Sequence, residues 1–193
     1  MKLGIFGGTF NPPHVGHLIV VESVCDTLHF DRIFFVPSSN PPHKLDPSLA
    51  PPLARLQMTR LAIEENSRFQ VSDIEIQRGG TSYSVDTVNA FAALYPTANL
   101  SLIIGVDNML EFNSWKDPTD ILAKAGLVAM SRPGFSVHHA SSELTRLATF
   151  ANVPQIGISG TDIRRRLKLG RSIRYLVPKP VEEFILRNGL YRD

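Results

Sequence analysis

The chain has 193 residues, a formal net charge of +2 and 43% hydrophobic residues, which is typical of a globular protein and excludes a disordered polymer. The small net charge gives no reason to expect nucleic acid as a partner, and no apolar stretch approaches the roughly 18–20 residues of a membrane span. A single cysteine, Cys25, cannot form an internal disulfide. We therefore expect a cytoplasmic protein that binds neither nucleic acid nor membrane, and the sequence leaves open whether it is a homo-oligomer.

Apolar, β-branched runs alternate with helical patterns along the chain. Strands are predicted over 2–7, 31–36, 69–76, 100–106, 126–131 and 154–158. Helices are predicted over 15–28, 51–66, 83–95, 118–124, 141–150, 160–168 and 179–188. Such alternation predicts an α/β fold with a mostly parallel, twisted sheet and helices on both faces. We expect one domain spanning 1–193, with a C-terminal helical part, about 159–193, packed on it.

The first strand leads into a helix through "GGTFNPPHVGH", residues 7–17. Gly7 and Gly8 would lie at the carboxyl end of the strand, where open parallel sheets bind ligands. The helix that follows offers unpaired N–H groups and the positive end of its dipole, which suit phosphate. His14 and His17 are three residues apart and project from the same side of the first turn. The stretch therefore predicts a site for polyphosphate oxygens.

Other interpretations of this stretch are weaker. The turn does not give the G-x-G-x-x-G of a dinucleotide site, and the chain contains no G-x-x-x-x-G-K-[ST]. A zinc site made of His14, His17 and His43 is disfavoured because one cysteine is available, so no protein-bound metal is expected. A capped turn with hydrogen-bonded surface histidines remains the structural alternative.

Two further loops follow predicted strands. Residues 37–52 hold six of the fourteen prolines and predict either a stiff connector or part of a ligand site. Residues 157–161 read "GISGT", which is close to a hydrolase elbow, but no histidine follows Ser159. Ser159 and Asp162 instead resemble a helix capping box. Ser159, Thr161 and Arg164 could then all contact an anion at the start of that helix.

Two segments suit an aromatic acid. "GGTSYS", residues 79–84, precedes a helix, so Thr81, Tyr83 and Ser84 with nearby N–H groups could bind a carboxylate. The only tryptophan, Trp115, has polar neighbours, which favours a stacking role over a core position. Arg132 is a weaker candidate for a phosphate contact, and Lys44 lies in the proline-rich loop.

Several of these stretches together resemble one family. "GGTFNPPHVGH" resembles the first motif of the nucleotidyltransferase superfamily, which ends H-x-G-H, and "ISGTDIR" resembles its second motif, I-S-S-T-x-I-R. With "PPHK", "GGTSYSVDT", "IIGVDNMLEFNSW", "SRPG" and "YLVPKPVEEFI", the chain resembles bacterial nicotinate mononucleotide adenylyltransferases from residue 3 to about residue 190. Two positions depart from the pattern. Asn11 stands where aspartate is common, and Gly160 replaces a serine, which would loosen one phosphate contact.

The resemblance implies a Rossmann-like nucleotidyltransferase fold and a reaction of ATP with nicotinate mononucleotide, assisted by Mg²⁺, that gives nicotinate adenine dinucleotide and pyrophosphate. Positive groups should ring such a site because two polyanions meet there. The resemblance makes His14, His17 and Arg164 catalytic. It assigns ATP to Gly7, Gly8, Thr9, Phe10, His14, His17, Gly105, Asp107, Ser159, Thr161 and Arg164. It assigns the mononucleotide to Ser38, Lys44, Thr81, Tyr83, Ser84, Trp115 and Arg132.

Three rival functions remain open at this point. Another adenylyltransferase of the superfamily, such as phosphopantetheine adenylyltransferase, would share both motifs but would not need "GGTSYS" or a polar tryptophan. A nucleotide-binding regulator without turnover would not need both histidines and Arg164. A nucleic-acid binder would use the basic run 164–174 and would bind any duplex with a steep salt dependence.

Overall fold

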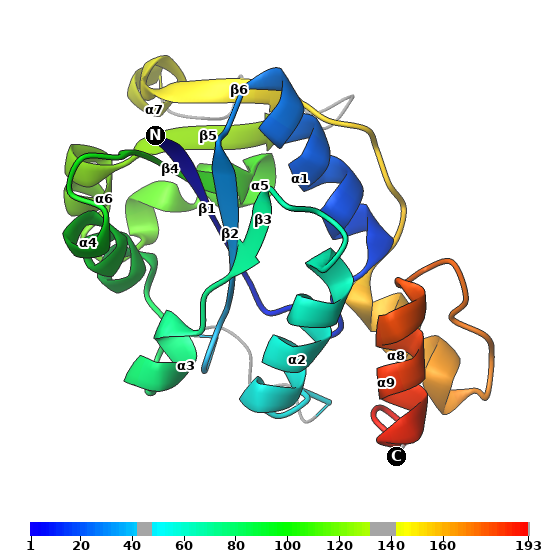
Figure 1. Ribbon diagram of the computed structural model, residues 1–193. Helices are drawn as coiled ribbons and strands as arrows, with labels where there is room; N and C mark the ends of the chain where they lie inside the picture. Colours follow the sequence, from blue (N-terminus) through cyan, green and yellow to red (C-terminus); the bar gives the residue numbers. More distant parts are fainter. Residues whose placement is uncertain (42–47, 132–141, 193) are drawn as a thin grey trace.

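The computed structural model describes residues 1–41, 48–131 and 142–192. These residues form a six-stranded sheet in the order β3-β2-β1-β4-β5-β6, and neighbouring strands pair in parallel throughout (Figure 1). The strands are β1 (Lys2–Gly8), β2 (Arg32–Pro37), β3 (Phe69–Val71), β4 (Asn99–Gly105), β5 (Gly126–Ser131) and β6 (Ala148–Asn152). The order reverses between β1 and β4, where open α/β sheets bind ligands. The predicted α/β fold is confirmed.

Helices cover both faces of the sheet because its inner strands are apolar on consecutive positions. Ile33 and Phe35 of β2 join one buried cluster, and Phe34 and Val36 join the other. The first cluster takes its helical side chains from α1 (Val15–Thr27), α2 (Pro52–Ile63), α8 (Gly160–Lys168) and α9 (Lys179–Arg187). The second takes them mainly from α4 (Ser84–Leu94), α5 (Val106–Leu110), η1 (Phe112–Ser114), α6 (Pro118–Lys124) and α7 (Ser142–Leu147). A short helix, α3 (Ile74–Arg78), follows β3.

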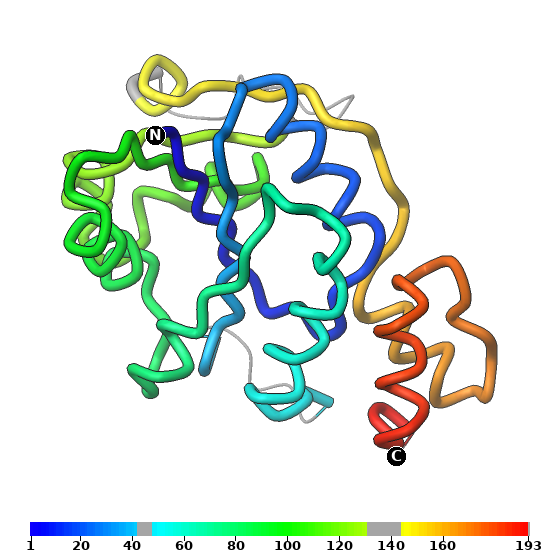
Figure 2. The backbone as a smooth tube through the Cα atoms, viewed as in Figure 1, coloured from blue at the N-terminus to red at the C-terminus, as the bar shows by residue number. Residues whose placement is uncertain are grey.

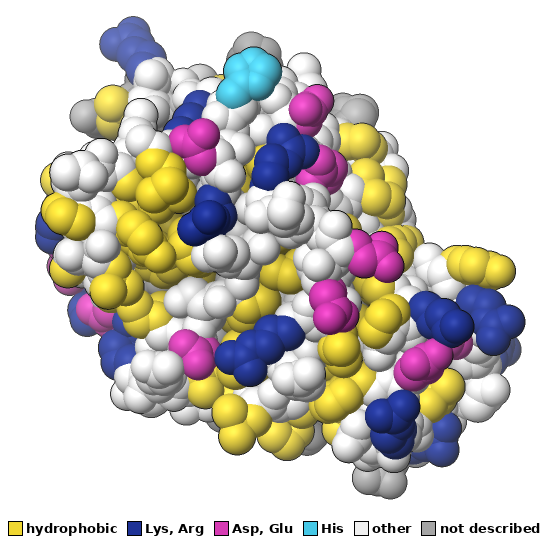
Figure 3. Space-filling model, viewed as in Figure 1, with side chains coloured by type: hydrophobic (Ala, Val, Ile, Leu, Met, Phe, Trp, Pro, Cys, Tyr) yellow, Lys and Arg dark blue, Asp and Glu magenta, His cyan; other side chains and the backbone are white. Residues whose placement is uncertain are grey.

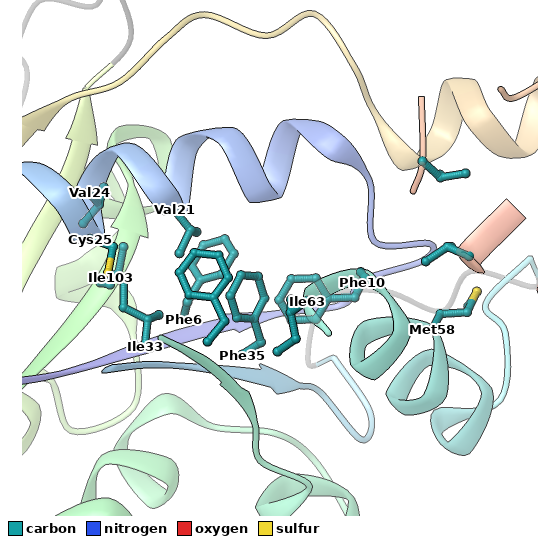
Figure 4. Packing of buried hydrophobic residues seen from close by; sticks show 14 of the residues in the cluster. Phe6, Phe10, Val21, Val24, Cys25, Ile33, Phe35, Met58, Ile63 and Ile103 are labelled. Carbon is teal, nitrogen blue, oxygen red and sulfur yellow. The ribbon is translucent and has the colours of Figure 1, made fainter. Parts of the chain in front are cut away.

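The first cluster reaches the ligand-binding end of the sheet. Figure 4 shows the rings of Phe6, Phe35 and Phe10 under α1, with Met58 of α2 beyond them. The chain from β6 runs past α1 to α8 and α9 at the C-terminal end (Figure 2). Ile163 of α8 is fully buried in the same cluster, so this helix is anchored to the sheet side of the molecule.

Three predicted elements differ from the structure. The predicted strand over 154–158 has no regular structure, and the sixth strand is β6, which overlaps the predicted helix over 141–150. Thr149 and Phe150 are residue types that favour strands, and they pair with β5, whereas Pro154 cannot donate to a ladder. The predicted strand over 69–76 ends at Val71, because Ile74 starts α3.

The described surface is mixed in charge. Figure 3 shows Lys and Arg side chains gathered over the region of α8 and α9, with acidic side chains among them. Arg165 forms an ion pair with Asp162, and Arg174 Nε lies 4.0 Å from Glu182 Oε2. Among the described residues, none of the helices combines the length and the hydropathy of a membrane-spanning segment.

Candidate active site

A cavity of about 570 Å³ opens where β1 and β4 end and where α1 and α8 begin. Three loops far apart in the sequence meet there: the β1–α1 turn, the start of α5 and the segment before α8. Its lining contains every residue predicted to bind ATP: Gly7, Gly8, Thr9, Phe10, His14, His17, Gly105, Asp107, Ser159, Thr161 and Arg164. The structure therefore brings both predicted motifs around one space.

The two histidines form a stacked pair at the start of α1. Their ring centroids lie 3.6 Å apart with 22° between the planes, and the backbone N–H of His14 donates to His17 Nδ1 at 3.2 Å. In a neutral His17 the proton therefore sits on Nε2. The His14 side chain faces the His17 backbone N–H in a capping-box arrangement, but its buried Nδ1 forms no full hydrogen bond with the described residues. An unpaired buried nitrogen is costly and fits a site that a ligand completes.

Burial keeps these rings neutral. Desolvation lowers the pKa of His14 to about 4, and desolvation together with the neighbouring His14 lowers the pKa of His17 to about 3. Both rings are therefore neutral in the free protein at pH 7. They can act as hydrogen-bond donors and acceptors, and a bound polyanion would raise both pKa values.

The turn between the strand and the histidines is rigid. Phe10 adopts a φ of +48° and is held by ring contacts with Phe6, Phe35 and His17, with centroids 5.3–5.8 Å apart. A Cβ on Gly8 would lie 2.9 Å from the Phe10 ring, whereas a Cβ on Gly7 would meet nothing within 4 Å. Gly8 is thus required by packing, and Gly7 leaves its space to the cavity.

The two residues that depart from the family pattern touch one another. A Cβ on Gly160 would lie 2.8 Å from the Asn11 carbonyl oxygen, so glycine lets the start of α8 approach the β1–α1 turn. Arg164 donates from Nη1 to the same carbonyl at 2.8 Å and from Nε to Ser48 Oγ at 2.9 Å. Arg164 therefore braces the turn while its charge lies at the cavity wall.

The remaining cradle residues sit at helix starts. Ser159 caps α8, and its Oγ accepts from the Asp162 N–H at 3.1 Å, so this half of the predicted capping box is confirmed. Asp107 lies in the first turn of α5, whose N-cap is Gly105. Its Oδ1 folds back close to where a Gly105 Cβ would be, so a larger residue there would turn the Asp107 carboxylate aside.

A second cavity of about 480 Å³ lies on the other side of the end of β1. The two cavities share Phe6, Gly7, Gly8, Thr9, Gly105 and Asn108. Of the residues predicted for the mononucleotide, Ser38, Tyr83, Ser84 and Trp115 line this cavity. Thr81 is exposed, does not line it and forms an isolated bridge with Asn40. Lys44 and Arg132 lie outside the described residues.

Aromatic rings and a lysine shape this second cavity. Trp115 is half-buried and rests against Phe112, with ring centroids 5.3 Å apart and 44° between the planes. Lys116 Nζ lies 4.8 Å from the Tyr83 ring centroid and 3.6 Å from Asp86 Oδ1. A flat ring could therefore lie against the indole with a cation near its edge.

Comparison with known proteins decides the family. The cytidylyltransferase-like family matches residues 5–166. A probable nicotinate-nucleotide adenylyltransferase of Thermus thermophilus is 44% identical over 192 residues, which cover all of both chains. The chain belongs to the cytidylyltransferase-like family, among the nicotinate-nucleotide adenylyltransferases. This full-length likeness favours that group over the phosphopantetheine alternative.

Solved structures of this family share the fold. A putative nicotinate-nucleotide adenylyltransferase from Vibrio parahaemolyticus aligns with a TM-score of 0.73 and 26% identity, covering 100% of this chain and 97% of that one. The nicotinic acid mononucleotide adenylyltransferase of Plasmodium falciparum complexed with NaAD aligns with a TM-score of 0.79 and 18% identity, covering 98% and 97%. Because its identity is only 18%, the Plasmodium structure supports the fold alone.

Several lining residues of this adenylyltransferase were missed from the sequence. Glu75, Ser82 and Lys116 line the second cavity, and Asn108 lines both. Lys116 directly follows Trp115, and Ser82 lies inside "GGTSYS", so adjacency could have identified these two. Glu75 sits between two isoleucines in a stretch that reads as a strand, so nothing in the sequence marked it as a site residue.

Proposed function

We propose that this protein transfers AMP from ATP to nicotinate mononucleotide, producing nicotinate adenine dinucleotide and pyrophosphate, in the biosynthesis of NAD. The observation that carries the proposal is the pair of cavities that meet at Gly7–Thr9 and Gly105. One is edged by turn residues, helix starts and an arginine, which suit a triphosphate. The other has an aromatic wall, which suits a pyridine ring.

The chemistry needs alignment more than an enzyme nucleophile. The mononucleotide phosphate attacks the α-phosphorus, and pyrophosphate leaves. The two cavities share a wall, so an acceptor phosphate in the second would lie beside a triphosphate in the first. His17 Nε2–H and the His14 ring would donate to phosphate oxygens, and Arg164 supplies fixed positive charge. Because the histidines are neutral before ATP binds, the polyanion itself draws protons onto the pair.

Mg²⁺ is part of the proposal. The described residues contain no group of three or more His, Cys, Asp or Glu side chains that could hold a metal ion by themselves. Mg²⁺ is commonly held by one or two carboxylates together with substrate phosphates, and Asp107 places a carboxylate in the first cavity. The donor set fits an ion that arrives with ATP, and such an ion would neutralise charge on the leaving pyrophosphate.

Recognition of the acid would come from the second cavity. Helix α4 begins at Ser84 beside Tyr83, so its free N–H groups can donate to the nicotinate carboxylate. Lys116 adds a cation at that edge. The amide of nicotinamide mononucleotide would turn an NH₂ donor toward these donors and be disfavoured. We propose the cytoplasm as the compartment, where ATP is available and Cys25 remains a buried free thiol.

Pyrophosphate release from ATP tests the proposal. The assay supplies nicotinate mononucleotide, its amide or phosphopantetheine as acceptor. We expect the acid to react fastest, with product of the mass of nicotinate adenine dinucleotide. Faster release with phosphopantetheine, or no release with any acceptor, would overturn the proposed function.

A further inference from the structure

We propose that Arg55 and Glu75 are positioning residues, joined by one hydrogen-bonded chain that fixes the spacing between the two cavities. The inference rests on the proposed function, because it concerns how the two substrates are aligned. It goes beyond the residues assigned to either substrate, since Arg55 lines neither cavity, and Glu75 and Ser82, which line the second, act here through the chain.

Arg55 ties together three loops from inside the protein. Arg55 belongs to α2 and is fully buried. Its Nη1 donates to the Thr9 carbonyl at 2.8 Å. Its Nη2 donates to the Ser39 carbonyl at 2.9 Å, and its Nε donates to the Ala50 carbonyl at 3.0 Å. Thr9 lines both cavities, and Ser39 adjoins Ser38 of the second cavity. One planar guanidinium thus holds the β1–α1 turn and the β2 loop at a fixed distance from one another.

The chain continues from Ser39 to the start of α4. The Ser39 N–H donates to Ser82 Oγ at 2.9 Å, and Ser82 is hydrogen-bonded to the Glu75 carboxyl. Thr87 Oγ1 donates to Glu75 Oε1 at 2.6 Å, which anchors the same carboxyl to α4. The β2 loop, the segment before α4 and α4 itself are therefore held together through Glu75. These are the elements that carry Ser38, Tyr83 and Ser84 into the second cavity.

The cost of this arrangement indicates that it is more than packing. Among the Lys, Arg, Asp and Glu residues that the structure describes, Arg55 and Glu75 are the buried ones. Burying a charge is expensive, and an apolar core of the same volume is often as stable or more stable. Burial raises the pKa of Glu75 above its ordinary value, against the opposing effect of its hydrogen bonds to Thr87 and Ser82. At this cost, two ionisable side chains lie buried at opposite ends of a chain that joins ligand loops.

The expected consequence is a loss of alignment. In-line attack requires the acceptor phosphate and the α-phosphorus to lie within about 3–3.5 Å, and a misplacement of about 1 Å can cost on the order of 10²-fold in rate. Breaking the chain should therefore lower kcat, while each cavity still binds its own substrate and KM changes little.

Ser82→Ala breaks the chain in the middle by deleting one hydroxyl. Thr59→Val is the matched control, because the buried Thr59 hydroxyl donates to the Arg55 backbone carbonyl at 2.8 Å and lies off the chain. We expect Ser82→Ala to lower kcat about 10- to 100-fold with each KM within about threefold of wild type. Thr59→Val should lower Tm and leave kcat within about twofold, since it removes a buried hydrogen bond away from the chain.

Arg55→Met and Glu75→Gln test the two ends. Each should lower kcat as Ser82→Ala does, and the double variant should be no slower than the slower single variant, because both act through one chain. Wild-type kcat in Ser82→Ala would overturn the inference. So would a loss confined to one KM, fully additive losses, or losses that follow Tm and vanish on cooling. If wild type adenylylates a different acceptor, the proposed function fails, and the same variants with that acceptor still test the chain.

Discussion

The two cavities of this adenylyltransferase are built in different ways. The first is made mostly of backbone turns, glycines and helix starts, and its His14–His17 pair comes from one contiguous stretch. Apart from β4 and the wall that it shares with the first, the second is lined by three separate segments: the β2 loop, residues 75–84 and residues 111–116. Under the proposed function, polyphosphate would be bound by turns and helix starts, and the pyridine ring by side chains that distant segments bring together. A substitution outside the shared wall of one cavity should therefore leave binding in the other largely intact.

The largest expected effect comes from His17→Ala. It removes a donor that lines the first cavity and should lower kcat on the order of 10²–10³-fold, as the loss of one donor to a transition-state oxygen does. His29→Asn is the control, because His29 is exposed, has a φ of +53° that asparagine tolerates, and lines neither cavity. Turnover of His17→Ala near that of the control would contradict the phosphate role.

Gly7→Ala should act on substrate without acting on the fold. A Cβ at Gly7 meets no protein atom within 4 Å and would project into the space that the cavities share. We expect kcat/KM to fall roughly tenfold or more while Tm stays close to wild type, because a methyl group there displaces ligand and leaves the core unchanged. Gly8→Ala is the contrast, since its Cβ would press on the Phe10 ring and lower Tm. A large loss of Tm in Gly7→Ala would show that the shared space is structural.

Trp115→Ala should affect one substrate only. Loss of the indole removes a stacking surface worth about 1–3 kcal/mol, so KM for nicotinate mononucleotide should rise roughly tenfold. KM for ATP should change less than about twofold, because Trp115 lies away from the first cavity. Steady-state kinetics with each substrate varied in turn measures both values. A comparable rise in both constants would remove the distinction between the cavities.

Lowering the pH should change the free energy of unfolding in opposite directions through His14 and through Glu75. Since the pKa of His14 is about 4 in the fold and about 6.5 when unfolded, the unfolded chain binds protons first as pH falls. The free energy of unfolding should therefore fall between about pH 6.5 and pH 4, and His14→Asn should lessen that fall. The raised pKa of Glu75 works the other way, so Glu75→Gln should steepen it. Urea unfolding at several pH values measures both slopes, and equal slopes in all three proteins would refute this account.

The first cavity could be predicted from sequence because its parts are local. Short stretches of sequence predict its glycine turn, its two histidines three residues apart and its capped helix. The parallel sheet then brings these segments together at one edge. The second cavity could be predicted only where residues adjoin, as at Tyr83, Ser84 and Trp115. The sequence did not mark Glu75 and Arg55 as candidate residues, because their contacts join segments that are distant in the sequence. β6 was missed because its pairing with β5 outweighed the helical reading of 141–150.

Intrinsic fluorescence of the wild-type protein tests most directly the claim that the two cavities hold different substrates. Trp115 is the only tryptophan of the chain and lies in the wall of the second cavity alone. Titration with nicotinate mononucleotide should quench its emission by stacking of the pyridine ring, and titration with ATP should leave the emission nearly unchanged. Quenching by ATP alone, with no further change on adding the mononucleotide, would contradict the account.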